Sequence, residues 1–129
     1  MHENEISYLV RGCIFKVYKT LGPGLLESAY EAALSYEIDK IGLKVRRQLT
    51  VPMEYESIVI DMGYKIDLLV EEKVIIEIKS VKQFHGVHYL QLLTYLKLAD
   101  LRLGLLVNFN CTDISKSIVR KVNGLDDNY

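Results

Sequence analysis

Apolar residues near the start of the chain recur with the period of an amphipathic helix. The first apolar stripe consists of Ile6, Leu9, Val10, Cys13, Ile14, Val17 and Leu21. Its spacing of three and four residues predicts a helix, which the Gly and Pro residues at positions 22–24 should end. A second helix is expected from about residue 25 to residue 41, with Gly42 as the residue that follows its end.

The middle of the chain has shorter apolar runs that alternate as strands do. Residues 43–53 and 58–62 alternate loosely, and each predicts a strand. Residues 64–79 contain two runs rich in Ile and Val on either side of Glu71, Glu72 and Lys73. Two such runs around a short polar segment predict an antiparallel hairpin with its loop at residues 71–73. Gly63 permits a bend before this hairpin.

The last third of the chain predicts a crossover between parallel strands. After a polar segment at residues 80–86, the pattern indicates a helix over about 87–99, with Leu92, Leu93 and Leu96 packing inward. Residues 103–109 form a nearly continuous apolar run, which is typical of a strand buried on both faces. Strand, helix and strand in this order should form a right-handed parallel unit. A closing helix is expected over residues 113–122, and a frayed end over residues 126–129.

The order of these elements predicts an α/β (α+β) fold. We expect a mixed sheet of four to five strands with an antiparallel hairpin and a parallel βαβ crossover, flanked by helices. The chain has 129 residues, which fits a single domain over residues 1–129. Half of the residues are hydrophobic and 26% are charged, so the composition is that of an ordinary globular protein.

Charge and cysteine content indicate which binding partners and which cellular compartment to expect. The net charge of −1 gives no general attraction to nucleic acid, so such binding would need a local patch. Lys44, Arg46 and Arg47 form a small basic cluster, which is more typical of a solvated sheet edge than of a phosphate site. The two cysteines form no disulfide framework, and we see neither a membrane-spanning run nor a signal peptide. A cytoplasmic location without membrane association is therefore expected.

The predicted hairpin brings together charges that an apolar sheet normally avoids. With a loop at residues 71–73, Asp67 faces Glu77, and strand alternation puts Lys79 on the same face. Opposed residues have Cβ atoms roughly 4.5–5.5 Å apart, and like charges at that distance destabilise the strand pair. A divalent cation between the two carboxylates would reverse the repulsion. A hairpin edge with solvated charges is the alternative.

Two helices carry further candidate residues. Glu27 and Tyr30 are three residues apart on a partly buried face of the second helix, although a favourable helix dipole would also explain a Glu in the first turn. His88, Gln91 and Tyr95 are spaced three and four residues apart and therefore line one side of the later helix. Ordinary polar helix surface is the alternative for these three.

These residues resemble the motifs of a known superfamily. Asp67, nine intervening residues and then Glu77–Lys79 resemble the motif of the PD-(D/E)XK nucleases, with Ile66 where the motif has Pro. Gln91 and Tyr95 resemble the Q-x-x-x-Y motif of the RecB-type exonucleases in that superfamily. The stretch 24–30, GLLESAY, resembles the GxxExxY signature of a family of small bacterial and archaeal proteins placed in the same superfamily.

The resemblance implies a restriction-endonuclease-like core and a divalent-metal-dependent nuclease, a hydrolase that acts on phosphodiester bonds, with DNA as the preferred nucleic acid. Asp67, Glu77 and Glu27 would bind Mg²⁺ or Mn²⁺, and a metal ion could orient and activate a water molecule. Lys79 is the third catalytic residue and would stabilise developing charge.

The remaining candidates would support this site. Gln91 and Tyr95 could orient Lys79 or contact the phosphate backbone, with Tyr30 and His88 as further supporting residues. A catalytically silent module of the same fold, which binds nucleic acid or a protein partner, is the alternative function. A weaker alternative is an interaction subunit that uses its nine tyrosines, since Tyr is enriched in interfaces. Homodimer formation stays open.

Overall fold

A computed structural model describes residues 1–126, so the expected fraying of residues 126–129 falls almost entirely outside the described range. In chain order the elements are α1 (Glu3–Leu21), α2 (Glu27–Lys40), β1 (Val45–Thr50), β2 (Met53–Tyr55), β3 (Ile58–Ile60), β4 (Lys65–Val70), β5 (Val74–Lys79), α3 (Gly86–Ala99), β6 (Leu103–Asn108), the short 3₁₀ helix η1 (Ile114–Lys116) and β7 (Ile118–Val122). The order and kind of elements confirm the predicted mixed architecture.

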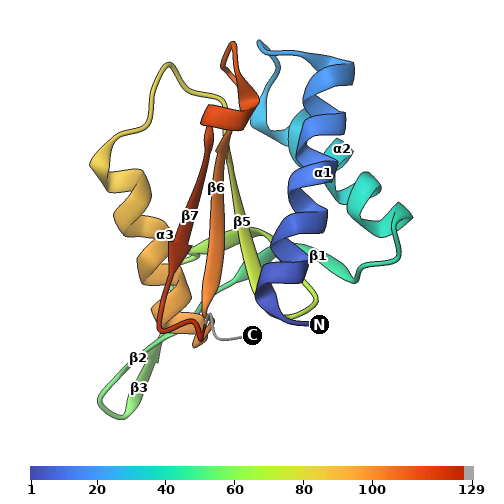
Figure 1. Ribbon diagram of the computed structural model, residues 1–129. Helices are drawn as coiled ribbons and strands as arrows, with labels where there is room; N and C mark the ends of the chain where they lie inside the picture. The colour runs from blue at the N-terminus through green and yellow to red at the C-terminus, as the bar shows by residue number, and fades with distance from the viewer. Residues whose placement is uncertain (127–129) are drawn as a thin grey trace.

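One mixed sheet forms the centre of the molecule. Its strand order is β1-β4-β5-β6-β7, and only the β5–β6 pair is parallel, as the predicted crossover through α3 requires. The helices α1 and α2 cover one face of the sheet, and α3 covers the other (Figure 1). The sheet is therefore buried between two helical layers, which explains the continuous apolar runs of β5 and β6.

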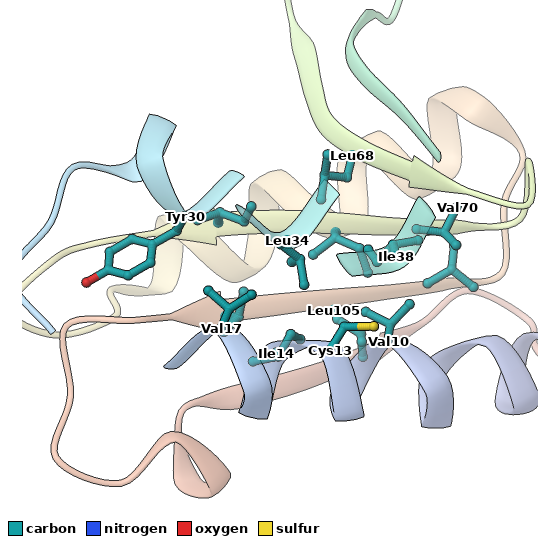
Figure 2. Close-up of a cluster of buried hydrophobic side chains, with 14 of the residues drawn as sticks. Val10, Cys13, Ile14, Val17, Tyr30, Leu34, Ile38, Leu68, Val70 and Leu105 are labelled. Atoms are coloured by element: carbon teal, nitrogen blue, oxygen red, sulfur yellow. The ribbon is translucent and has the colours of Figure 1, made fainter. Parts of the chain in front are cut away.

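The larger core lies between the sheet and the helices α1 and α2. The apolar stripe of α1, including Cys13, packs against side chains of α2 and of the central strands, as Figure 2 shows. Burying one such aliphatic side chain contributes about 1.5–3 kcal/mol, so this stripe fixes α1 on the sheet. Although α1 is the longest helix, no helix within residues 1–126 is long and apolar enough to cross a membrane.

The smaller core lies under α3. Leu92 and Leu96 pack against Ile75 and Leu106, whereas Leu93 is only partly buried and belongs to neither core. Leu92 sits directly over Gly104, where an added Cβ would come within 2.7 Å of the Leu92 Cδ1 atom. Because this close approach needs the absent side chain, Gly104 sets the height of α3 above β6.

The predicted closing helix at residues 113–122 is wrong. Asp113 caps the single turn η1 through its carboxylate, and the chain then continues as β7 antiparallel to β6. Ile118, Val119 and Val122 are β-branched and favour a strand. The sheet edge offered by β6 therefore decides the structure of this segment, and β7 becomes the fifth strand.

The single strand expected over residues 43–53 is divided. β1 ends at Thr50, and Pro52, which has no N–H to donate to a ladder, precedes β2. β2 and β3 form a separate two-stranded arm, residues 53–60, that projects from the sheet (Figure 1). Val51 N–H donates to the Tyr64 carbonyl at 2.8 Å and closes the base of the arm. The arm is thus a long connection between the neighbouring strands β1 and β4.

Candidate functional site

The β4–β5 hairpin ends its regular pairing just before its two carboxylates. The predicted register is confirmed from Val70 opposite Val74 to Leu68 opposite Ile76. Beyond that pair the ladder stops, and the side-chain carboxylates of Asp67 and Glu77 accept backbone N–H groups across the hairpin instead. The Asp67 N–H donates to Glu77 Oε1 at 3.2 Å, and the Ile78 N–H donates to Asp67 Oδ2 at 2.8 Å. The carboxylates therefore occupy a position where backbone groups would otherwise pair.

Both carboxyl groups hold their protons more tightly than usual. Glu77 is only 4% exposed, and burial, followed by the negative charge of Asp67, raises its pKa to about 8. Burial also raises the pKa of Asp67, against the lowering effect of the Ile78 N–H. A buried carboxylate next to a partly buried one is a costly arrangement, which a shared proton or a hard cation relieves. The pair therefore has the donor chemistry of a divalent metal site.

Lys79 lies at the same end of β5, on the side that Glu77 shares by strand alternation. Its positive charge lowers the pKa of Asp67 and of Glu77, although less than burial raises them. The Lys79 side chain is partly buried, and its carbonyl accepts the Phe109 N–H at 3.0 Å. The backbone of Lys79 is therefore fixed next to β6, and its charge acts on both carboxylates.

The expected third carboxylate, Glu27, borders the same site without joining the pair. Glu27 and Asp67 line one cleft between α2 and the sheet. The Glu27 carboxylate accepts the Ser80 N–H at 3.1 Å, so it anchors the residue that follows Lys79. Within residues 1–126 no three His, Cys, Asp or Glu side chains converge to hold a metal ion. The three-carboxylate set is therefore not assembled in this structure.

Two cleft residues, Glu31 and Gln48, were not expected from the sequence. Glu31 lies one turn after Glu27 and is only 6% exposed. Its Oε2 accepts two N–H groups of Arg47 at 3.0 and 3.1 Å, and its Oε1 accepts the Gln48 amide. The same amide lies 3.3 Å from Asp67 Oδ1. The only sequence signal for Glu31 was its position four residues after Glu27, which places both on one helix face.

Tyr30 has a role in the fold beside the site. Its ring is fully buried and stacks on Phe109, with centroids 4.3 Å apart. Its hydroxyl donates to the Gly22 carbonyl at 2.6 Å and accepts the Leu25 N–H at 3.1 Å. The Leu25 carbonyl in turn accepts the Ser80 hydroxyl. Tyr30 therefore fixes the loop before α2, and that loop holds the chain just after Lys79.

The three candidate residues on α3 do not all lie at the site. Tyr95 is 5% exposed, and its pKa is raised by burial first and then by the charges of Glu77 and Asp67. The Gln91 side chain acts in the opposite direction and lowers the pKa of Tyr95. His88 instead accepts the His85 N–H through Nδ1 at 3.1 Å and caps the start of α3. Tyr95 thus lies close enough to the carboxylates for their charges to act on it, whereas His88 bonds within its own helix. That Gln91 faces the site stays a prediction.

The basic cluster of Lys44, Arg46 and Arg47, on and just before β1, forms ion pairs within the chain. Lys44 and Arg46 both pair with Glu72, at 3.2 and 2.9 Å, and Arg47 pairs with Glu31. These pairs agree with the interpretation of the cluster as a sheet edge. Lys79, whose charge acts on both Asp67 and Glu77, is in none of these pairs.

Comparison with known protein families gives one match. The family described as the PD-(D/E)XK nuclease superfamily matches residues 4–121, which is most of the chain. Neither the curated proteins nor the solved structures gave a match. The mixed five-stranded sheet with its parallel β5–β6 pair is consistent with a restriction-endonuclease-like fold. The finer resemblance to the GxxExxY proteins and the Q-x-x-x-Y motif stays a prediction.

Proposed function

We propose that this chain, which belongs to the PD-(D/E)XK nuclease superfamily, is a divalent-metal-dependent nuclease that hydrolyses phosphodiester bonds in DNA. Nucleases of this superfamily usually use divalent metals. The observation that carries the proposal is the open end of the β4–β5 hairpin. There, the buried carboxyl group of Glu77 accepts the N–H of the partly buried Asp67, and the charge of Lys79 acts on both carboxylates.

Asp67 and Glu77 are the residues that would hold Mg²⁺ or Mn²⁺. Mg²⁺ commonly keeps several waters and takes only one or two protein carboxylates, so this pair is a sufficient protein contribution. A bound ion supplies Lewis-acid polarisation of a phosphoryl oxygen and lowers the pKa of a water molecule. Glu27, whose carboxylate is bonded to Ser80 N–H, supports the end of β5 in this proposal.

Lys79 would stabilise the negative charge that develops on the phosphoryl oxygens. Its charge acts on both carboxylates, and the residue is partly buried, where such a charge acts more strongly than in solution. Tyr95 and Gln91, which lie one turn apart on α3, would restrict Lys79 and Glu77 from the other side. Because the net charge is −1, this local positive charge is what would attract the phosphate backbone.

The first test is a titration with Mn²⁺ of the wild-type protein and of Asp67→Asn. Ligand binding to the folded state stabilises it, by about 2.7 kcal/mol at a hundredfold excess over Kd. We expect a metal-dependent rise in Tm that Asp67→Asn abolishes, together with Mn²⁺-dependent cleavage of DNA. Asp39→Asn is the matched control, because Asp39 is exposed at the far end of α2.

The result separates the two functions considered. Absence of any Tm shift up to millimolar Mn²⁺ would contradict the metal site. Mn²⁺ binding without cleavage of single- or double-stranded DNA or RNA would instead support a catalytically silent module. In that case, retained DNA binding by gel shift would identify nucleic acid as its partner.

A further inference from the structure

The pairing of β1 with β4 has a gap opposite the catalytic carboxylate. The ladder runs from Val45 opposite Val70 to Arg47 opposite Leu68, and it resumes with Leu49 opposite Ile66. The skipped positions are Gln48 and Asp67. Since the β4–β5 ladder also stops before Asp67, this residue lies outside the regular pairing on both sides.

Gln48 has an unusual backbone conformation for a strand. Its φ is +52°, in the left-handed region that side chains with a Cβ rarely adopt. Four other non-glycine residues of the described part share this conformation: Glu56, Glu71, Glu72 and Asp100. Those four lie in hairpin turns or at a helix end, where such a conformation is common. Gln48 alone among residues 1–126 combines it with a place inside a strand.

The conformation aims the Gln48 side chain at two carboxylates. Its amide donates to Glu31 Oε1 and lies 3.3 Å from Asp67 Oδ1. Arg47 holds the other Glu31 oxygen, so Glu31 is fixed between helix α2 and strand β1. A chain of contacts thus runs from Arg47 through Glu31 and Gln48 to Asp67.

We propose that Gln48 is a positioning residue for Asp67, which it holds in the cleft by linking the carboxylate to Glu31 on α2. The two Asp67 oxygens are then held from opposite sides, Oδ2 by the Ile78 N–H and Oδ1 by the Gln48 amide. The inference rests on the proposed function, because metal binding by Asp67 is the reason to hold its carboxylate in one position. Partners that orient a metal-binding carboxylate typically affect metal affinity by 10–100-fold.

A purely structural irregularity would have different properties. A gap in the ladder with positive φ is best filled by Gly, which adopts this conformation without steric cost. Such a gap has no use for an amide directed at Asp67. Replacement of Gln48 by Gly therefore separates the two roles, because it keeps the backbone and removes the amide.

The experiment compares Gln48→Gly with wild type in two measurements. In metal-free crystal structures, we expect the Asp67 side chain to rotate away from the cleft in Gln48→Gly. In solution, we expect an Mn²⁺ Kd raised about tenfold or more in isothermal titration, with Tm close to that of wild type. Glu56→Gly is the matched control, because Glu56 has φ +54° in the exposed turn of the arm and no contact with the cleft.

A second variant, Gln48→Asn, tests the same inference if Gln48→Gly does not fold. Gln48→Asn keeps an amide and tolerates positive φ, but it is shorter by one methylene and should also release Asp67. The inference is overturned if Asp67 keeps its wild-type position in the variants. It is also overturned if the Tm of the variants falls while their folded state binds Mn²⁺ with the Kd of wild type. If wild type neither binds Mn²⁺ nor cleaves DNA while Asp67 still moves in the variants, the proposed function fails and the positioning by Gln48 stands.

Discussion

The two ends of the β4–β5 hairpin use the same two strands in different ways. At the closed end, Val70, Val74, Leu68 and Ile76 pair regularly and are completely buried. At the open end, carboxylate oxygens of Asp67 and Glu77 accept backbone N–H groups, and Asp67 also contacts the Gln48 amide of β1, which bonds to Glu31 of α2. One end is held by its own ladder and apolar contacts, and the other by long-range polar contacts.

The difference shows how one short element can combine stability with reactivity. Apolar pairs lower the free energy of the folded state, whereas buried carboxylates raise it unless they find a partner. Because regular strands adjoin the carboxylates directly, the costly groups are held in place by the neighbouring pairs. We therefore expect mutations at the closed end to affect stability, and mutations at the open end to affect metal binding and turnover.

The largest effect on stability is expected for Ile76→Ala at the closed end. Ile76 is fully buried between Leu68 and Leu105, and such truncations cost about 2–5 kcal/mol. Urea denaturation measures the loss. Val59→Ala in the arm is the control, because Val59 is 67% exposed and should change stability by less than about 0.5 kcal/mol. If folded Ile76→Ala no longer responded to Mn²⁺, the closed end would also affect metal binding, which would contradict the separate roles of the two ends.

Lys79→Ala should have the next largest effect, on turnover. Loss of one charge-stabilising group typically lowers a rate by about 10²–10³-fold, equivalent to about 3–4 kcal/mol. Cleavage of labelled DNA under single-turnover conditions measures it, with unchanged circular dichroism as evidence of an intact fold. Lys97→Ala, an exposed change in the last turn of α3, should cleave normally. Wild-type cleavage by Lys79→Ala would remove Lys79 from the mechanism.

Glu77 should make the metal-free protein less stable as the pH rises. Its pKa is about 8 when folded and ordinarily 4.5, so between these values the folded protein keeps a proton that the unfolded chain has released. The free energy of unfolding therefore falls from about pH 4.5 to pH 8 and then levels off. Each pKa unit corresponds to about 1.4 kcal/mol.

Glu77→Gln keeps an acceptor for the Asp67 N–H but cannot ionise. Its stability, measured in urea with a chelator present, should exceed that of wild type by an amount that grows by at least about 2 kcal/mol between pH 5 and pH 9. Mn²⁺ should reduce this difference, since it favours the ionised wild-type carboxylate. Parallel pH profiles for the two proteins would show that Glu77 is not the titrating group.

The smallest effect is expected for Tyr30→Phe, which loosens the support of the open end. The change removes the hydroxyl that bonds Gly22 and Leu25, at a cost of about 1 kcal/mol. Thermal denaturation measures it, with Tyr36→Phe, an exposed position on the same helix, as control. Unchanged stability together with lost cleavage would place the Tyr30 hydroxyl in the chemistry instead.

Local patterns were sufficient to predict most elements and the carboxylate pair. The loop at residues 71–73 determines the register of the hairpin, and the register alone places Asp67 near Glu77. The prediction for residues 113–122 was wrong because the spacing of their apolar residues fits a helix or a strand about equally. Only the edge of β6, formed by distant contacts, selects the strand.

The surroundings of the site could not be predicted in the same way. Glu31, Gln48 and Asp67 come from three elements, and no period along the chain relates them. The positive φ of Gln48 could not be predicted from its residue type, because Gly or Asn is the usual residue in this conformation. Long-range polar contacts of this kind become visible only when the elements are packed.

The arm formed by β2 and β3 has a consequence for how such a chain can change over generations. Val51 and Tyr64 close the β1–β4 ladder beneath it, and the exposed residues between them include Tyr55, Ile58 and Val59. Insertions or deletions within residues 53–62 therefore leave the sheet and its carboxylates untouched. The length and chemistry of the arm can be altered by selection independently of the proposed metal site.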